Sequence, residues 1–553
     1  MNTFLSANRS ASGESRSQES HSQHSDNQGS GSELTLPVPL RGYADNSDDE
    51  GVWARKTILS FDGGGVRGFS SLLIVKRLMT RIRDIESHHL EGPVHSSVSY
   101  PWMGSDLRDA AGVDEPPNLS DRVDDFLPCH YFDYMVGTST GGLAAIMLGR
   151  LRMTVDEALD QYAEFGNKVF GKPRWFHERS LLWYPRAKFS CRKTRDAFKS
   201  VVYRSIVSQR DNIQDYEASA AASAEPFKYR EDRTRTMVMS FCIDREAGIS
   251  CPYMWRSYDH QFDPETRDSN QWNPLNPDSA HTEKIWQVAR ATSAAPRYFE
   301  CIKIGKKKFL DGGLSANNPS LAALREIKSQ HQSIPALFLS VGTGKKRANC
   351  KRVHTPRDDI GEVLREFGRS ETIDNVRRKQ FIKKYLEIGR HAKDNLIDTE
   401  GDNGVNGWRS HAQAMGLKET FRLNVEDDLF QVSLDDWHPA NTGQTTLDNI
   451  RNQTDAYLQK ESVIRHIDSI ARQVVDIRRA RAHTERWELF AVDVDYYCRD
   501  GKCAVATHYS SRDRLRNHLE KSTKHRGMSP EEVEASLNSG RVVKVRKPIN
   551  TGI

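Results

Sequence analysis

A single serine stands at the centre of the most chemically informative stretch of this sequence. Gly137, Ser139 and Gly141 form the pattern G-x-S-x-G, between the apolar residues 134–136 and a run rich in Leu, Ala, Ile and Met. That order predicts a buried strand, a sharp turn and a helix, with the serine at the apex of the turn. Glycines flank such a serine because a Cβ would clash where the chain reverses. The pattern predicts a nucleophile elbow, with an ordinary glycine-rich turn as the alternative.

A nucleophilic serine needs a base, because its hydroxyl is hardly ionised at neutral pH. A histidine is the usual partner, but no histidine of this sequence stands in a comparable turn at the end of a strand. Asp311 does, since it follows a strand-like run and precedes Gly312 and Gly313. A carboxylate acts as a base when burial raises its pKa towards the working pH. Ser139 and Asp311 are therefore the candidate nucleophile and base.

A glycine-rich loop supplies a third candidate element. Residues 57–61 read as a strand, residues 62–68 read DGGGVRG, and the apolar spacing that follows predicts a helix. A glycine loop between a strand and a helix exposes backbone N–H groups that hold an anion. The loop also matches the G-x-G-x-x-G of dinucleotide sites, but residues 81–97 show no second strand with an acidic end. We expect an oxyanion hole, with a nucleotide site and a structural turn as alternatives.

The elements that must position these groups alternate along the chain. The apolar runs 237–243 and 335–341 predict buried strands, and residues 420–425 are one more candidate strand. Amphipathic helices are predicted at residues 154–166 (with a capping box from Thr154 to Glu157), 193–209 and 284–295, and a loop at residues 218–224. Strands that alternate with helices predict an α/β fold with a largely parallel sheet covered on both faces.

Composition narrows the class of protein. The 553 residues are enough for several domains, and the net charge of +5 gives no argument for nucleic-acid binding. Eight scattered cysteines are typical of a reduced, intracellular chain rather than one held by disulfides. The N-terminus has no signal-peptide pattern, and no stretch approaches about 18 apolar residues. We expect a cytoplasmic protein with no transmembrane segment, whose contact with membranes is peripheral.

Three motifs in order now resemble the signature of patatin-like phospholipases: Asp62–Gly68 (DGGGVRG), Gly137–Gly142 (GTSTGG) and Asp311–Gly313 (DGG). The flanking runs resemble that family too, namely Ala294–Phe299, Asn317–Pro319 and Ser340–Gly344. The resemblance implies a patatin-like three-layer sandwich. It also implies a Ser–Asp dyad of Ser139 and Asp311, and an oxyanion hole built from the loop residues Gly63, Gly64, Gly65, Arg67 and Gly68.

The family's reaction is hydrolysis of a lipid ester through an acyl-serine intermediate, without calcium or another catalytic cofactor. The resemblance therefore implies a lipid substrate at a membrane or micelle surface. Two other interpretations stay open. One is an acyltransferase or thioesterase on the same dyad, and the other is a catalytically silent scaffold that works through a C-terminal module.

That C-terminal module resembles a C2H2 zinc finger. Its expected ligands are Cys498, Cys503, His518 and His525, because two thiolates on a knuckle and two histidines on one helix face bind structural zinc. Six residues separate the histidines, where three to five are usual, so the helix must be distorted before His525. The alternative is a charged helical tail with two ordinary cysteines. Arg512, Arg514 and Arg516 point to a nucleic-acid partner, and a protein partner is the other candidate.

These features divide the chain into five expected parts. The parts are a disordered tail (1–52), a catalytic domain (53–345), a helical extension like that of fungal members (346–485), a zinc-finger-like module (486–535) and a flexible tail (536–553). Two further surfaces attract attention. The aromatic residues at 175–184 have three interpretations: they line an acyl pocket, face a membrane interface or pack in the core. The basic run 377–384 has two: it contacts anionic lipid, or it is a solvated surface.

Overall fold

The computed structural model describes residues 51–90, 92–99, 126–174, 187–210, 213–244, 246–260, 275–277, 279–331, 333–345, 399–400, 405–426, 428–501, 503, 507–509 and 511–543. The expected N-terminal tail lies outside these residues except at its end, 51–52. The aromatic residues at 175–184 and the basic run 377–384 also lie outside them.

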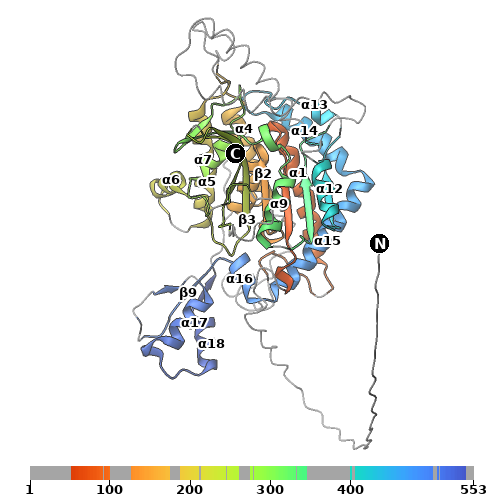
Figure 1. The fold of residues 1–553 in the computed structure, drawn as a ribbon. Helices are drawn as coiled ribbons and strands as arrows, with labels where there is room; N and C mark the ends of the chain where they lie inside the picture. The colour runs from red at the N-terminus through yellow and green to blue at the C-terminus, as the bar shows by residue number, and fades with distance from the viewer. Residues whose placement is uncertain are drawn as a thin grey trace, which may run out of the picture. The chain divides into compact units, whose positions relative to one another are not determined.

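An eight-stranded sheet forms the centre of the fold, in the order β5-β6-β3-β2-β1-β7-β8, with β4 paired to β3 (Figure 1). The strands are β1 Thr57–Phe61, β2 Tyr134–Thr138, β3 Arg235–Asp244, β4 Ile249–Arg256, β5 Ile302–Ile304, β6 Lys307–Asp311, β7 Leu337–Val341 and β8 Thr420–Leu423. Strands β3, β2, β1, β7 and β8 run parallel to their neighbours in that order, while β4, β5 and β6 pair antiparallel. The prediction of a largely parallel sheet is confirmed.

Helices cover both faces of this sheet. Side chains alternate along each strand, so Ile58 belongs to one hydrophobic cluster and Leu59 to another. The cluster of Leu59 includes residues of α1 Gly68–Ser87, α3 Thr140–Ala145, η7 Ile146–Arg150, α4 Val155–Val169, α5 Cys191–Gln209, α6 Asp215–Ala224, α7 Ile285–Thr292, α14 Gln444–Leu458 and α15 Glu461–Ala482. The cluster of Ile58 includes α9 Ser320–His331 and α12 Val405–Ala414. The result is the expected three-layer α/β arrangement.

Short helices connect the larger elements. They are η2 Gly51–Trp53, η3 Gly65–Arg67, η6 Pro128–His130, α8 Gly313–Ala316, α13 Asp428–Gln431 and α16 Glu485–Ala491. The predicted capping box of α4 is present, because the Thr154 amide donates to Glu157 at 2.8 Å and the Glu157 amide donates to Thr154 at 3.1 Å. The loop expected at residues 218–224 is wrong, since α6 occupies that run.

Strand β3 has three partners, and that fixes how two strand ends meet. Residues 237–244 pair with β4 along one edge. On the other edge, residues 235–239 pair with β2 and residues 240–244 pair with β6. Since β2 runs parallel to β3 and β6 antiparallel, the C-terminal ends of β2 and β6 meet head to head beside residues 239 and 240.

The C-terminal module is built from β9 Val494–Tyr497, β10 His508–Tyr509, α17 Arg512–Lys521, η9 Thr523–His525, α18 Pro530–Ser539 and β11 Arg541–Val543. Strand β9 lies between β10 and β11 in a small antiparallel sheet. The module extends past the expected boundary at residue 535, which falls inside α18. Residues 536–543, which we expected in a flexible tail, therefore belong to the end of α18 and to β11 with the residue between them.

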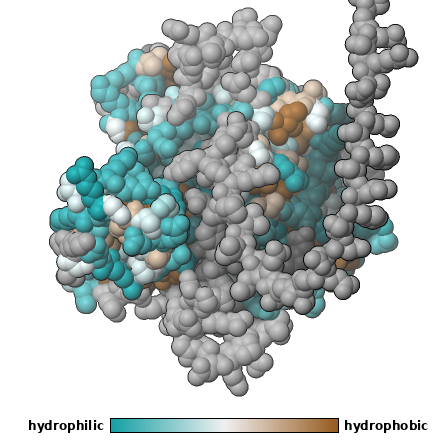
Figure 2. All heavy atoms as spheres, turned by 90° about the horizontal axis from the view of Figure 1, so that it is seen from below, coloured by the Kyte–Doolittle hydropathy of each residue, from teal (hydrophilic) through white to brown (hydrophobic). Residues whose placement is uncertain are grey.

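No helix among the described residues is both long and apolar enough to cross a bilayer. Figure 2 shows one face of the molecule, on which the described residues are mostly hydrophilic and the hydrophobic ones form small, separate groups. Among the described residues, few large apolar side chains are exposed, and they are scattered. The most exposed of these side chains are those of Leu90, Tyr216 and Ile249. Scattered apolar residues of this kind are normal on a protein surface.

Candidate active site

The structure places Ser139 on a strained turn between β2 and α3. Its backbone has φ 54° and ψ −124°, a conformation that a residue with a side chain rarely adopts. Strain of this kind gathers at functional sites, where the surrounding structure holds it in place. The turn is possible only with a glycine at 137, because a Cβ there would lie 2.0 Å from the carbonyl oxygen of Gly141. The predicted elbow geometry is thus present.

Ser139 and Asp311 come together at the head-to-head junction on β3. Ser139 follows the last residue of β2, and Asp311 is the last residue of β6. The Ser139 hydroxyl donates to Oδ2 of Asp311 at 2.7 Å. The other carboxylate oxygen accepts from the Gly313 amide at 2.8 Å. The distance between the two side chains is therefore set by the hydrogen bonds of the sheet and of the DGG turn.

The electrostatic environment of Asp311 suits a base. Its carboxyl is fully buried, and this burial raises its pKa to about 7. The hydrogen bonds from Ser139 and from the Gly313 amide favour the charged form and oppose the rise. A general base works best when its pKa lies near the working pH, because it is then both unprotonated and basic enough to take a proton.

Thr292, the last residue of α7, holds the turn at Ser139 through hydrogen bonds. Its hydroxyl accepts from the Ser139 amide at 2.8 Å and donates to the Met239 carbonyl at 2.6 Å. Its own carbonyl accepts from the Gly312 amide at 3.2 Å. One residue thus touches the nucleophile turn, β3 and the aspartate turn. Sequence reasoning missed it, although the run Ala294–Phe299, which carries part of the resemblance, begins two residues later.

The glycine-rich loop faces the same cavity as Ser139, but its residues differ in what they offer. The Gly63 amide donates to the Asn317 carbonyl at 3.0 Å, so it is already used. Gly64 and Gly65 line the cavity beside Ser139. Gly65 has φ 56°, and a Cβ there would lie 2.0 Å from the Leu434 carbonyl oxygen. The Gly64 amide donates to the Thr140 hydroxyl at 3.3 Å. That bond is long and ends on a hydroxyl that can rotate, so the candidate oxyanion donors are the amide of Gly65 and, once it exchanges the hydroxyl for an oxyanion, the amide of Gly64.

Arg67 supports this loop and is not among the residues that line the cavity beside Ser139. Its guanidinium donates to the Phe430 carbonyl at 3.1 Å and lies 5.2 Å from the centre of the Phe430 ring. It also donates to the Gly64 carbonyl at 3.4 Å. Burial lowers its pKa to about 10, which leaves it a cation at neutral pH. These contacts support the shape of the loop, and Gly68 begins α1 next to it. That Arg67 helps hold the oxyanion stays a prediction.

Residues far along the chain complete the wall of the loop. The Leu434 carbonyl accepts from the Val66 amide at 2.9 Å. Arg422, buried in β8, forms ion pairs with Asp62 and with Glu400. The loop therefore depends on residues 399–434, a region for which the sequence offered no site residue.

A pocket opens over the dyad, with about 500 Å³ of empty space that includes open solvent. Its polar end holds Ser139 and Asp311, and the rest of the wall is mainly apolar and aromatic, formed by Leu143, Phe165, Phe170, Ala295, Tyr298, Phe299 and Leu434 among others. A second pocket, with about 400 Å³ of empty space that includes open solvent, shares Leu143 and Phe165 with the first, and most of its other lining residues are aliphatic or aromatic. An apolar space that ends at a serine hydrogen-bonded to a carboxylate suits a long hydrocarbon chain with a reactive carbonyl.

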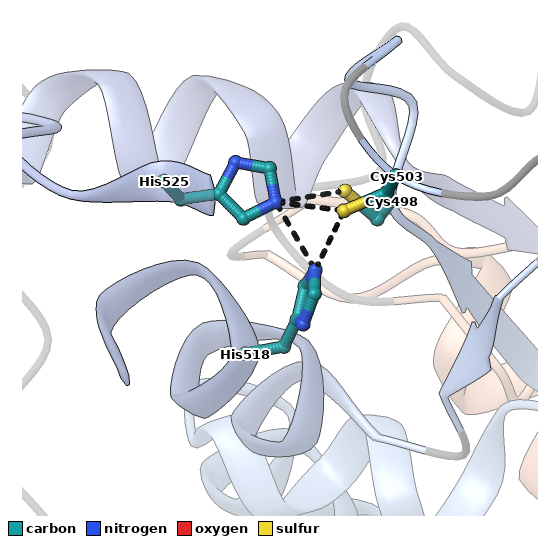
Figure 3. A group of neighbouring side chains, drawn as sticks. All are labelled: Cys498, Cys503, His518 and His525. Carbon is teal, nitrogen blue, oxygen red and sulfur yellow. Dashed lines mark hydrogen bonds between the residues drawn. The ribbon is translucent and has the colours of Figure 1, made fainter. Parts of the chain in front are cut away.

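The four ligands predicted in the C-terminal module also come together (Figure 3). The ligand atoms of Cys498, Cys503, His518 and His525 all lie within 4.8 Å of one another. Nε2 of His525 lies 3.5 Å from Sγ of Cys498, 3.1 Å from Sγ of Cys503 and 3.1 Å from Nε2 of His518. Sγ of Cys503 lies 3.3 Å from Nε2 of His518. This group shares no element with the dyad.

Residues 59–324 match the patatin-like phospholipase family. The sequence is 25% identical over 322 residues to calcium-independent phospholipase A2-gamma of Homo sapiens, covering 58% of this chain and 31% of that protein. It is 28% identical over 310 residues to the 85/88 kDa calcium-independent phospholipase A2 of Mus musculus, covering 53% and 31%. It is 24% identical over 316 residues to patatin-like protein 4 of Arabidopsis thaliana, covering 53% and 60%. The match thus spans 31% of the length of each of the two phospholipases A2.

Proposed function

We propose that this protein, whose residues 59–324 belong to the patatin-like phospholipase family, hydrolyses the ester bonds of lipids through a Ser139–Asp311 dyad. The observation that carries the proposal is the 2.7 Å hydrogen bond from the Ser139 hydroxyl to a buried aspartate whose pKa is raised to about 7. The names of the phospholipases A2 among its relatives support lipid esters as the substrate class and independence from calcium.

The reaction starts when Asp311 takes the proton of the Ser139 hydroxyl as its oxygen attacks the ester carbonyl. The carbonyl oxygen becomes an oxyanion, which the amides of Gly64 and Gly65 stabilise; one such donor typically lowers the barrier by about 2.7–4 kcal/mol. Asp311 then gives the proton to the departing alcohol, which leaves an acyl-serine. Water, activated by the same carboxylate, releases the fatty acid and restores the serine.

The cavities support a long acyl chain as the part of the substrate that is recognised. The chain enters along Phe165 and Phe170 and extends into the second cavity past Leu143. A substrate of this kind is drawn from a membrane or micelle surface, which the enzyme contacts peripherally. Cytoplasmic localisation stays an expectation from the cysteines. Transfer of the acyl group to an alcohol other than water uses the same intermediate, so the dyad alone does not separate a hydrolase from an acyltransferase.

The test is hydrolysis of a panel of phospholipids, lysophospholipids, galactolipids and triacylglycerols by the full chain, with a calcium chelator present throughout. We expect release of long-chain fatty acid from at least one class, faster than release of acetate from a short ester. A fluorophosphonate should label the protein at Ser139, and peptide mapping identifies the labelled residue. Labelling at another serine would overturn the dyad, and acyl transfer to an added alcohol in preference to water would identify a transferase.

The pH dependence of hydrolysis follows from the raised pKa of Asp311. The base works only as a carboxylate, so kcat/KM should fall about tenfold for each unit that the pH drops below about 7 and level off above it. Initial rates at low substrate concentration between about pH 5 and pH 9 measure this dependence of kcat/KM on pH. A profile that is flat across that range would contradict Asp311 as the base.

A further inference from the structure

The C-terminal module contains a group of side chains that the proposed hydrolysis does not use. Within the described residues, Cys498, Cys503, His518 and His525 form the one group of thiols, imidazoles and carboxylates close enough to share a metal ion. Cys498, Cys503 and His525 are buried. Neither cysteine is in a disulfide. The convergence of these four potential ligands in so small a module requires a physical explanation.

The distances measured between the ligand atoms are close to those of a tetrahedral zinc site. Zinc binds sulfur at about 2.3 Å and nitrogen at about 2.0–2.1 Å, so tetrahedral geometry places sulfur and nitrogen about 3.6 Å apart and two nitrogens about 3.3 Å apart. Three of the four sulfur–nitrogen distances are 3.5, 3.3 and 3.1 Å, and the nitrogen–nitrogen distance is 3.1 Å, all slightly shorter than these values. Figure 3 shows both rings pointing their Nε2 atoms towards the two sulfurs.

The local structure resolves the unusual spacing of the histidines. Helix α17 carries His518 and ends at Lys521. Ser522 then accepts a hydrogen bond from the Lys524 amide and starts the short turn η9, whose last residue is His525. The chain therefore leaves the α-helix between the two ligands, and six intervening residues bring His525 back to the sulfurs. On the other side, the Cys503 amide donates to the Asp500 carbonyl at 3.0 Å and closes the knuckle.

Neighbouring groups orient the two imidazoles. Oδ2 of Asp500 lies 3.1 Å from Nδ1 of His525, the ring nitrogen that points away from the sulfurs. The contact does not have hydrogen-bond geometry, but a small rotation would let this carboxylate accept the ring N–H, as carboxylates beside metal-bound histidines do. The ring of Tyr509 lies against His518, with the two ring centres 5.0 Å apart. Both ligand nitrogens are therefore held in the direction that a shared metal requires.

We infer that Cys498, Cys503, His518 and His525 bind one Zn²⁺ ion in a closed, structural site. Two thiolates and two neutral imidazoles are the donor set that zinc prefers, and two thiolates neutralise its charge in a buried position. Four protein ligands leave no position for a substrate or an activated water. The ion therefore stabilises the module and takes no part in ester hydrolysis.

The packing of the module explains why it needs such an ion. Its own apolar core is small, with Leu515 and Leu519 of α17 against Val533 and Leu537 of α18. A core of this size rarely keeps fewer than about 70 residues folded without a metal or disulfide. The same cluster continues to Trp487 of α16. The zinc ion thus holds β9 and α17 together, over an apolar core that extends to α16.

The arginines of α17 support a structural role as well. Arg512 and Arg516 both form ion pairs with Glu534 of α18 at 2.7 Å. Two of the three cations that pointed to a nucleic-acid partner are therefore engaged inside the module. The helix that would enter a DNA groove in a conventional finger is packed against α18 along that side.

The experiment measures metal in the full-length protein, purified without chelator, by plasma mass spectrometry and native mass spectrometry. We expect about one Zn²⁺ per chain. Exchange of zinc for Co²⁺ should give the visible bands of tetrahedral cobalt bound to sulfur, a signature that reports the ligand set directly. Cys503→Ala and His525→Ala should lose the ion, while Cys301→Ser and His508→Ala, outside the ligand group, should keep it. Asp500→Asn should keep zinc but bind it about 10–100-fold more weakly.

A folded, metal-free protein that takes up neither zinc nor cobalt would overturn the inference. A disulfide between Cys498 and Cys503, found by peptide mapping under non-reducing conditions, would overturn it too. If the ligand variants do not fold, the cobalt spectrum of the wild-type chain still tests the inference. Octahedral or oxygen-bound cobalt gives bands that differ from those of tetrahedral cobalt bound to sulfur. Zinc content that is unchanged in both ligand variants would place the metal elsewhere.

Discussion

Replacing Ser139 by alanine is expected to lower kcat for ester hydrolysis by about 10⁴-fold or more, because no covalent intermediate can form without the hydroxyl. Asp311→Asn should have an effect of the same order, since asparagine cannot accept the proton of Ser139. The two residues act as one unit, so the double variant should be no slower than the worse single variant. Steady-state rates on the best substrate of the lipid panel measure all three.

Stability measurements separate a loss of chemistry from a loss of fold in these variants. The pKa of Asp311 is about 7 in the folded protein and near its ordinary value in the unfolded chain. The carboxyl thus contributes stability at low pH that is lost as the pH rises from about 4 to about 7. At pH 8 the buried charge is a cost, and Asp311→Asn should unfold at the same temperature as the wild type or higher.

Two substitutions serve as controls for the dyad. Ser208→Ala removes a buried hydroxyl of α5 that donates to the Ser205 carbonyl of its own helix. Asp244→Asn changes a carboxylate at the far end of β3, where Oδ1 accepts from the amides of Glu246 and Ala247. Both should keep the wild-type rate. Hydrolysis that survives in Ser139→Ala would show that the reaction uses another nucleophile.

The second large effect is expected from Gly137→Ala, one methyl group added to the elbow. The new Cβ would lie 2.0 Å from the Gly141 carbonyl oxygen and 2.5 Å from the Gly142 amide nitrogen, which are backbone atoms with little freedom to move. The turn must shift, and a displacement of about 1 Å at a nucleophile costs about 10²-fold in rate. We expect at least that loss in kcat, with a decrease of about 2–4 kcal/mol in the free energy of unfolding. Kinetics and urea unfolding measure the two effects.

Gly501→Ala is the matched control for the elbow variant, because a Cβ at that glycine meets no atom within 4 Å. It should change neither quantity by a measurable amount. A Gly137→Ala enzyme with full activity would mean that the elbow tolerates a side chain, and the strained geometry of Ser139 would lose its explanation.

The sequence was most informative where a local pattern dictates a local conformation. G-x-S-x-G predicts the turn at Ser139 because the glycines report a backbone that excludes side chains. Asp311 was found because it stands between a strand and two glycines. Apolar runs gave the strands for the same reason, since a strand buried on both faces has few polar positions.

The parts that were missed depend on contacts between distant segments. Thr292 holds the Ser139 amide, and Leu434 supports the oxyanion loop, yet neither belongs to a motif. The same limitation applies to the contact of Arg67 with Phe430, which lies 363 residues away. The error at residues 218–224 has another origin. A run of alanines was read as low complexity, although alanine has the highest helix propensity of all residues.

The central strand of the sheet also has a consequence for how the protein is made. Strand β1 pairs with β2 on one edge, but Thr57 meets Leu337 of β7 on the other. At typical rates of synthesis, the ribosome needs roughly 15–60 s to reach that partner. Until then this strand, which is fully buried in the folded protein, has an open edge, which is a template for aggregation. Production of this protein in a foreign host should therefore depend on chaperones that bind nascent chains and on slow translation at low temperature.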